Sequence, residues 1–200
     1  MFASLFGKSE PKNSFKLSRE DKIQLLRFAR NALELYITEN SIPNYDEAEI
    51  NPANLNQMGA FVTLYKNGEL RGCIGHIESD KPLYKTIQSL TISSATKDYR
   101  FKSVKQDELS SIEIEISVLT PMKKISSINQ IEIGRHGIYI KKGFQTGTFL
   151  PQVANETGWS VEDFLGRCAR DKAHIGWEGW KDADLFTYEA MKFSESDFKE

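Results

Sequence analysis

The hexapeptide Leu70–Gly75, LRGCIG, combines residue types that thiol chemistry uses. Arg71 precedes Cys73 by two positions, and Gly72 and Gly75 lie on either side of the cysteine. The thiolate is the nucleophilic form of cysteine, and a nearby guanidinium favours it. The glycines leave room for a substrate or for another backbone segment. The same residues also fit a buried, inert cysteine in a tightly packed strand, so the hexapeptide alone leaves both interpretations open.

A β-hairpin is expected to position these side chains. Two β-type runs are separated by Asn67-Gly68, a dipeptide that tolerates the positive φ angles of a type I′ turn. Because side chains alternate between the two faces of a strand, Arg71 and Cys73 are predicted to share one face, where Arg71 lowers the pKa of the thiol and clamps an anion. A two-residue loop fixes the predicted register as Lys66–Glu69, Leu64–Arg71 and Val62–Cys73.

Other ionisable residues could complete such a site. In the segment DYRF, Asp98 and Arg100 either form a local ion pair that fixes a loop or line a cleft beside Cys73. Glu115 shares a strand face with Glu113, which fits an acid–base pair or the solvent side of a half-buried sheet.

The histidines offer candidates for a general base. His76 lies three residues from Cys73, on the opposite face of a regular strand, so only a β-bulge would bring the two together. His136 lies in a glycine-bounded turn of the kind that carries functional loops, and we prefer it slightly to His174.

The composition favours an ordinary globular protein. Of 200 residues, 40% are hydrophobic, and 26 basic and 28 acidic residues are interleaved to a net charge of −2. Because nucleic acids and anionic membranes select a basic stripe, we expect neither as a partner. Two cysteines are too few for a secreted disulfide framework, and no apolar run approaches the ~20 residues of a membrane span, so a cytoplasmic location is predicted.

Metal and cofactor motifs are absent from the sequence. It contains no C-x-x-C, no H-E-x-x-H and no phosphate-binding glycine loop, and the cofactor is left unknown. Cys168 follows Phe164 at helical spacing and is predicted to lie in a core. Trp177 and Trp180 either cover a core edge or form an exposed interaction patch.

The remaining pattern predicts an α+β fold with a mainly antiparallel sheet and helical inserts. Residues 1–16 are expected to be a loose lead-in, followed by one domain over residues 17–195. The order strand-strand-helix-strand occurs twice, which suggests a duplicated topology in two unequal subdomains. The further elements are a helix from Ser18 to Asn40, a helix from Leu83 to Lys97, strands over residues 112–118, 131–143 and 146–150, a helix capped by Ser160, and a closing strand over residues 185–193.

Several of these segments resemble the AMMECR-type domain, called protein A of the AmmeMemoRadiSam system in prokaryotes. The matching stretches are GAFVTLYKNGELRGCIG, DYRF, IEIEISVL, IGRHGIYI and GTFLPQVANETGW. The resemblance implies an α+β fold with two unequal subdomains and LRGCIG near the cleft between them, and it implies no known reaction. One departure is His136, where many relatives are expected to carry Asp.

Two functions follow from the residues and the resemblance together. In the first, the protein is an enzyme or enzyme component that uses Cys73 as nucleophile or carrier, in a modification pathway with a Memo-like protein and a radical S-adenosylmethionine protein. Arg71 would then hold an anion, with Asp98, Arg100 or Glu115 as polar support. In the second, the domain is a non-catalytic adaptor that docks these partners. An accessible Cys73 in a cleft favours the enzyme, and a sealed Cys73 beneath a flat apolar patch favours the adaptor.

Overall fold

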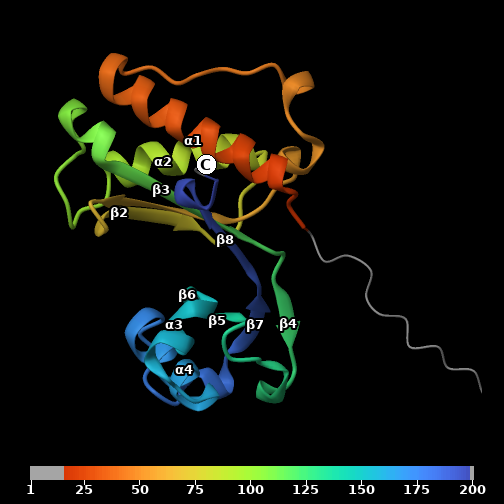
Figure 1. The fold of residues 1–200 in the computed structure, drawn as a ribbon. Helices are drawn as coiled ribbons and strands as arrows, with labels where there is room; N and C mark the ends of the chain where they lie inside the picture. The colour runs from red at the N-terminus through yellow and green to blue at the C-terminus, as the bar shows by residue number, and fades with distance from the viewer. Residues whose placement is uncertain (1–15, 199–200) are drawn as a thin grey trace, which may run out of the picture.

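The computed structural model describes residues 16–198, so the predicted lead-in lies outside the described residues except for residue 16. The chain forms two unequal lobes, each built on a four-stranded antiparallel sheet (Figure 1). The large lobe contains α1 (Arg19–Glu39), β1 (Ala60–Lys66), β2 (Glu69–His76), α2 (Leu83–Thr96), β3 (Ile112–Leu119) and β8 (Ala190–Ser194). The small lobe contains β4 (Lys123–Ile125), β5 (Gly137–Lys142), β6 (Gln145–Phe149), α3 (Pro151–Thr157), α4 (Val161–Arg167) and β7 (Asp184–Tyr188). The predicted α+β class is confirmed.

Short helical segments complete the chain. The 3-10 helices are η1 (Glu47–Glu49), η2 (Pro52–Leu55), η3 (Gln106–Ser111), η4 (Ile128–Gln130), η6 (Gly179–Asp182) and η7 (Glu195–Phe198). The segment η5 (Cys168–Lys172) is a π-helix that continues α4. The predicted helix capped by Ser160 therefore divides into α4 and η5, and α3 precedes it as an additional short helix.

The predicted duplication is present as topology. The strand order is β2-β1-β3-β8 in the large sheet and β6-β5-β7-β4 in the small one. In each lobe a hairpin is followed by a helix and then by a strand that pairs antiparallel with the first strand of the hairpin. The two lobes thus repeat the same order of hairpin, helix and strand.

The fourth strand of each sheet, β8 in the large lobe and β4 in the small lobe, follows directly after the chain has crossed from the other lobe. The chain leaves the large sheet between β3 and β4 and returns between β7 and β8, so the predicted single strand over residues 185–193 is two strands in different sheets. The two segments that cross between the lobes are hydrogen-bonded to each other. The Thr120 N–H donates to the Glu189 carbonyl at 2.9 Å, and the Glu189 N–H donates to the Thr120 hydroxyl at 2.8 Å. Glu189 is the single residue between β7 and β8, and its backbone N–H and carbonyl both bond to Thr120.

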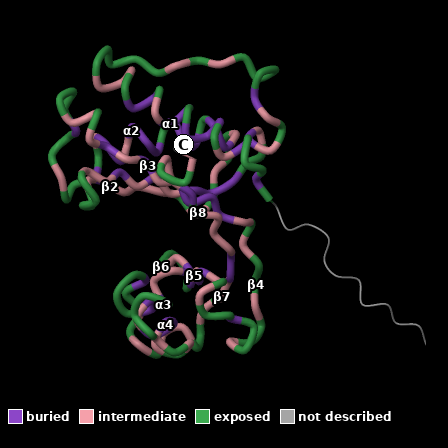
Figure 2. The backbone as a smooth tube through the Cα atoms, in the orientation of Figure 1, coloured by how far each residue is buried: buried purple, intermediate pink, exposed green. Residues whose placement is uncertain are grey.

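Each lobe has its own hydrophobic core (Figure 2). Ser18 forms a capping box with Asp21, and the apolar stripe of α1 includes the buried Leu25, Phe28 and Leu33. Together with α2 this helix covers one face of the large sheet, and the small lobe lies toward the other face (Figure 1). The large sheet therefore has one dry face and one face that remains free of helices.

The hairpin is present and the predicted pair Lys66–Glu69 is confirmed, but the predicted pairs Leu64–Arg71 and Val62–Cys73 are wrong. A β-bulge places Leu64 opposite Gly72 and Thr63 opposite Cys73, so Arg71 is the extra residue without a partner on β1. The cause is the close approach of α2. A Cβ atom added to Gly72 would lie 2.1 Å from the Ser94 carbonyl oxygen, and the Ser94 hydroxyl inserts between the strands.

We expect Gly72→Ala to lower the free energy of unfolding by about 2 kcal/mol, because the added methyl group meets helix backbone rather than a movable side chain. Urea denaturation measures this loss. Glu69→Ala, at an exposed position of the same strand, is the matched control and should change stability by less than about 0.5 kcal/mol. Equal stability of the two variants would contradict the close approach of α2 to Gly72.

Candidate functional site

Cys73 lies on the face of the large sheet that the helices leave free. The strand register makes a row of Cys73, Thr63 and Glu115 across β2, β1 and β3. Val62 and Leu64 point to the opposite face and are fully buried beneath the helices. Cys73 itself is half-buried, and the Thr63 hydroxyl donates a hydrogen bond to its sulfur at 3.2 Å.

Residues at the end of α2 hold the backbone of β2 at this point. The Asp98 carboxylate accepts the Cys73 N–H at 2.8 Å. The Ser94 hydroxyl accepts the Ile74 N–H at 3.0 Å and donates to the Val62 carbonyl at 2.8 Å, so it bridges β2 and β1. The backbone N–H groups of Cys73 and of the next residue, Ile74, are therefore both bonded to side chains in or directly after α2.

Asp98 and Arg100 form the predicted ion pair and also reach Cys73. The Asp98 side chain is 2% exposed and accepts two hydrogen bonds from the Arg100 guanidinium, at 2.9 and 2.7 Å. This bidentate pairing holds the pKa of Asp98 well below its usual range, although burial opposes the effect. Arg100 also approaches the Cys73 carbonyl at 3.5 Å, and its side chain remains 45% exposed. Asp98 and Arg100 therefore form the local ion pair and also lie beside Cys73, so the two predicted alternatives hold together.

The pKa of the Cys73 thiol is raised, which is opposite to the predicted direction. Burial is the largest cause; the Thr63 hydrogen bond and the charge of Arg100 lower the pKa, whereas Asp98 and Glu115 raise it. The thiol is therefore neutral near pH 7 in the free protein. The prediction failed because it counted the nearest cation in sequence and omitted desolvation and two carboxylates that come from elsewhere in the chain.

Arg71 is engaged with Glu108 of η3. Its guanidinium donates two hydrogen bonds of 3.0 Å to the Glu108 carboxylate, which Lys66 contacts at 2.9 Å. Both side chains of the Arg71–Glu108 pair are largely buried, and the pairing lowers the pKa of Glu108 to about 2. The guanidinium that acts on the thiol is that of Arg100.

Glu115 is paired as well. Lys192 of β8 contacts its carboxylate at 3.0 Å, and this hydrogen bond raises the pKa of Lys192. Burial and, after it, the charge of Glu115 raise the pKa of Tyr65. Glu113 shares the strand face but accepts the Ser196 N–H at 3.2 Å, so the two glutamates have separate partners.

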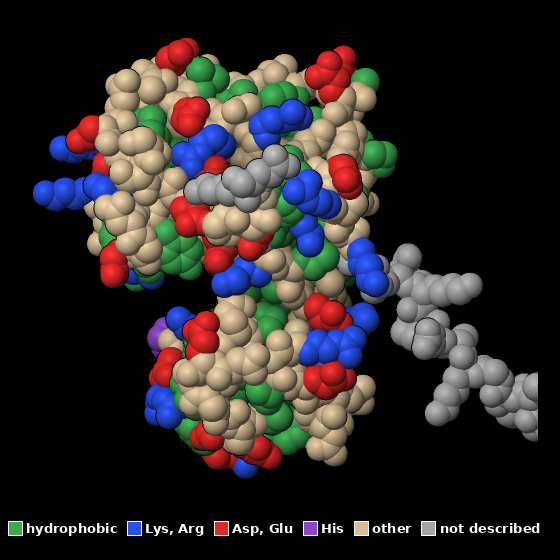
Figure 3. Space-filling model, in the orientation of Figure 1, with side chains coloured by type: hydrophobic (Ala, Val, Ile, Leu, Met, Phe, Trp, Pro, Cys, Tyr) green, Lys and Arg blue, Asp and Glu red, His purple; other side chains and the backbone are tan. Residues whose placement is uncertain are grey.

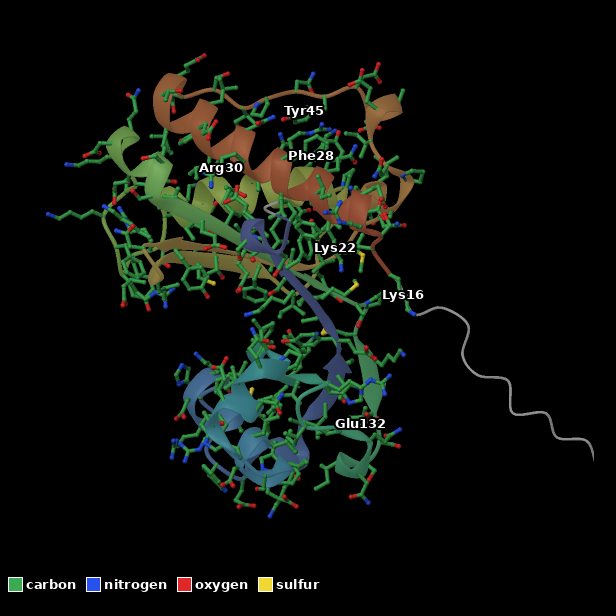
Figure 4. The ribbon with its side chains drawn as sticks, in the orientation of Figure 1. Lys16, Lys22, Phe28, Arg30, Tyr45 and Glu132 are labelled. Atoms are coloured by element: carbon green, nitrogen blue, oxygen red, sulfur yellow. The ribbon has the colours of Figure 1, made fainter. Side chains whose placement is uncertain are left out.

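The histidines do not join this group. The Nδ1 atom of His136 accepts the Glu132 N–H at 3.1 Å within a turn of the small lobe, where Figure 4 labels Glu132. His76 ends β2 and lines a cavity of about 790 Å³ at the base of the crossing strands. His174 adopts a positive φ of 55° after η5.

The sequence did not predict three residues of this site, which are Thr63, Ser94 and Lys192. The one-residue error of register placed Val62 rather than Thr63 opposite the cysteine. Ser94 and Lys192 are separated from Cys73 by 21 and 119 positions, and only the tertiary fold brings them to this face. The bulge itself had one signal, a glycine in mid-strand, which often marks close backbone approach.

The free face borders a notch between the lobes, which Figure 3 shows on the side away from the crossing strands. Glu156 of α3 contributes to raising the pKa of Lys192, so both lobes contribute charge here. Cys73 does not line the cavity of about 1230 Å³ beside α1 or the cavity of about 790 Å³ near His76. Within residues 16–198 no cluster of three or more His, Cys, Asp or Glu is arranged to hold a metal ion.

The remaining candidates belong to the core of the small lobe. Cys168 has no exposed surface, and burial raises its pKa to about 12. Trp180 packs against this core, and the indole of Trp177 lies against Gly166. Both tryptophans are half-buried and cover a core edge. None of the helices in the described part of the chain has the length and apolar character to cross a bilayer.

The fold and the site define an α+β protein of two repeated lobes, with a half-buried cysteine on the free face of the larger sheet. The chain matches the model of the AMMECR1 family over residues 26–193 and belongs to that family. A Methanopyrus kandleri protein is 38% identical over 192 residues, covering 91% of this chain and 92% of its own. A Methanosarcina mazei protein is 36% identical over 180 residues, covering 86% and 90%. The crystal structure of the uncharacterized protein PH0010 from Pyrococcus horikoshii superposes with a TM-score of 0.82 at 33% identity and covers 90% of this chain and 93% of that one.

The buried Arg71–Glu108 pair predicts a specific pH dependence. The pKa of Glu108 is about 2 in the folded protein and about 4.5 in the unfolded chain, so the carboxylate contributes stability that is present above pH 4.5 and lost as the pH falls toward 2. Glu108→Gln removes this contribution. In urea denaturation, the stability difference between wild type and variant should shrink between pH 5 and pH 3. For the control Glu69→Gln, at an exposed site, the difference should stay constant.

Accessibility and charge predict the order of thiol labelling. Iodoacetamide should label Cys73 well before Cys168, because Cys168 is fully buried with a pKa of about 12. Arg100→Gln should move the midpoint of Cys73 labelling to higher pH, since the variant loses the cation that favours the thiolate. Arg71→Ala is the matched control and should leave the midpoint unchanged. A shift with Arg71→Ala but none with Arg100→Gln would contradict the assignment of the guanidinium; circular dichroism checks that both variants fold.

Proposed function

We propose that the protein is an enzyme component whose Cys73 thiol acts as nucleophile or carrier on the face of the notch. The observation that carries this proposal is the fixed, half-buried sulfur, which receives a hydrogen bond from Thr63 and has the exposed guanidinium of Arg100 beside it. These are the two groups that favour the thiolate form of Cys73 over the thiol. Arg100 takes the role of thiolate stabiliser and anion clamp that the sequence assigned to Arg71.

The electrostatics indicate how such a thiol would be activated. Burial, Asp98 and Glu115 keep it neutral, while Thr63 and Arg100 favour the thiolate. A positively charged group bound beside Glu115 would offset one of the opposing charges and shift this balance. The sulfur would then attack an electrophilic carbonyl carbon and form a thioester, and the leaving group would depart with the proton of the thiol.

The expected setting is a modification pathway with a Memo-like protein and a radical S-adenosylmethionine protein. This part of the proposal rests on the family resemblance. A reducing, cytoplasmic location is consistent with two cysteines that are both unpaired.

The second candidate function is a non-catalytic adaptor. It is favoured by Tyr99, whose side chain is 95% exposed in the loop beside Asp98 and Arg100. An exposed aromatic ring next to a polar surface is typical of protein contacts. In this case Cys73 would contribute to the shape of the surface and form no bond.

Mass spectrometry of the intact protein tests the thiol reaction. We expect protein isolated from cells that co-express both partner proteins to carry an adduct on Cys73 that hydroxylamine releases, and the partner proteins to copurify with it. Cys73→Ser should abolish the hydroxylamine-labile adduct and leave the copurification intact, while the Cys168 peptide, as an internal control, stays unmodified. Absence of any adduct, with unimpaired pathway output from Cys73→Ser, would leave the adaptor function and reject the catalytic one.

A further inference from the structure

A fully exposed phenylalanine at the tip of the β5–β6 hairpin has no partner in the catalytic proposal. Lys142 and Gln145 close a two-residue loop of Gly143 and Phe144, with Gly143 at a φ of 60°. Phe144 is completely exposed. An aromatic ring at the tip of a turn offers a large apolar area that a partner with an apolar pocket can bury.

The surroundings of Phe144 are basic. Lys141 and Lys142 end β5, and η5 lies beside the hairpin, because a Cβ on Gly147 would meet the side chain of Lys172 at 2.8 Å. All three lysines are exposed, and no ion pair within residues 16–198 involves them. We call Phe144 with these three lysines the basic knob.

Acids near the basic knob are already paired. Asp184 lies opposite Lys141 in the register, but Lys124 contacts its carboxylate at 2.6 Å. Asp171 is held by Arg170, also at 2.6 Å. The charges of Lys141 and Lys142 are therefore available to an acidic surface, and Lys172, whose ammonium lies 5.4 Å from the centroid of the Phe149 ring, adds to the positive charge beside them.

The large lobe carries a groove of complementary character. It has a volume of about 1230 Å³ and runs along α1 beside η3, on the lobe where Figure 4 labels Arg30. Its lining includes the apolar side chains of Leu35, Pro43 and Leu109. We call it the acidic groove.

Carboxylates exceed cations in the acidic groove. Glu34, Glu39, Asp107 and Glu195 line it against the single guanidinium of Arg30, so four negative charges and one positive charge give −3. Arg30 pairs with Glu195 and, at 3.9 Å, with Glu34, and it also donates to the carbonyls of Leu109 in η3 and Ile112 in β3. One guanidinium thus serves two of the four carboxylates, and Glu39 and Asp107 have no ion pair within residues 16–198. An apolar floor with an acidic rim fits an aromatic ring with a basic collar.

We propose that the basic knob of one molecule docks in the acidic groove of a second copy of the same chain. The two surfaces are complementary in shape, because the hairpin tip protrudes and the groove is concave. They are also complementary in charge, because the formal charge of the knob is +3 and that of the groove is −3. A hairpin tip buries less surface than a standard protein interface, so the association is weak and depends on concentration. Cys73 does not line the acidic groove, and the proposed contact requires no bond to its sulfur.

Sedimentation velocity of the full chain tests the contact. The weight-average sedimentation coefficient should rise between about 10 μM and about 1 mM protein, and the rise should diminish in high salt, which screens the lysines. Phe144→Ala should weaken self-association at least about tenfold, since it removes the central anchor. Tyr99→Ala, which removes another exposed ring, is the matched control and should associate like wild type.

Charge exchange identifies the two surfaces. A knob variant with Lys141→Glu and Lys142→Glu, and a groove variant with Glu34→Lys and Glu39→Lys, should each be monomeric alone because like charges meet. Mixed in equal amounts they should associate, since each knob then finds a groove of opposite charge. All four positions are exposed, so both variants should fold, which a cooperative thermal unfolding transition would establish.

The proposal is overturned if wild type remains monomeric throughout this concentration range, or if it associates and the mixed variants do not. Association that persists in Phe144→Ala and in both charge variants would place the contact on another surface. A partner of a different class, such as an acidic protein that binds only the knob, would appear as a monomeric wild type and would equally reject the contact between copies.

Discussion

The contact between the end of α2 and strand β2 governs both the fold of the large lobe and the environment of the cysteine. Ser94 presses its carbonyl oxygen to where a side chain of Gly72 would stand, and its hydroxyl bridges the two strands of the hairpin. The strand accommodates this approach with one extra residue, Arg71. Because that residue shifts the register, Thr63 rather than Val62 comes to lie beside the Cys73 sulfur.

The same contact determines which charges act at the site. Asp98 follows α2, and one of its carboxylate oxygens accepts the Cys73 N–H. Because a buried carboxylate requires a charged partner, Arg100 pairs with Asp98. A cation therefore stands beside the thiol as a consequence of how the backbone is fixed. Arg71, released by the bulge, joins η3 to the hairpin through Glu108. In this lobe Arg71 therefore holds η3 to the hairpin, and Arg100 is the cation beside the thiol.

The repeated topology explains why the free face lies where it does. Each lobe builds a hairpin, a helical segment and a third strand, and each then borrows its fourth strand from the chain that crosses between lobes. The two crossing segments are bonded to each other at Thr120 and Glu189, which brings the small lobe toward the free face of the large sheet (Figure 1). The small lobe contributes its own charge to the notch through Glu156. Neither lobe alone would create this polar, partly enclosed surface.

Local patterns in the sequence determined the elements of this protein. The Ser18 cap, the Asn67-Gly68 turn and the alternation from Ile112 are each decided by residues within a few positions of one another, and the corresponding helix, turn and strand are present. The doubled order of strands and helices likewise predicted the duplicated topology. Only the tertiary structure decided the register at Cys73, the separation of β7 from β8, and the partners of Arg71. The register depends on the Ser94 carbonyl, the separation of β7 from β8 depends on the crossing between the lobes, and the partner of Arg71 is Glu108. All of these lie far away in the chain. The spacing of residues in the sequence carries no information about desolvation or about the close approach of distant segments.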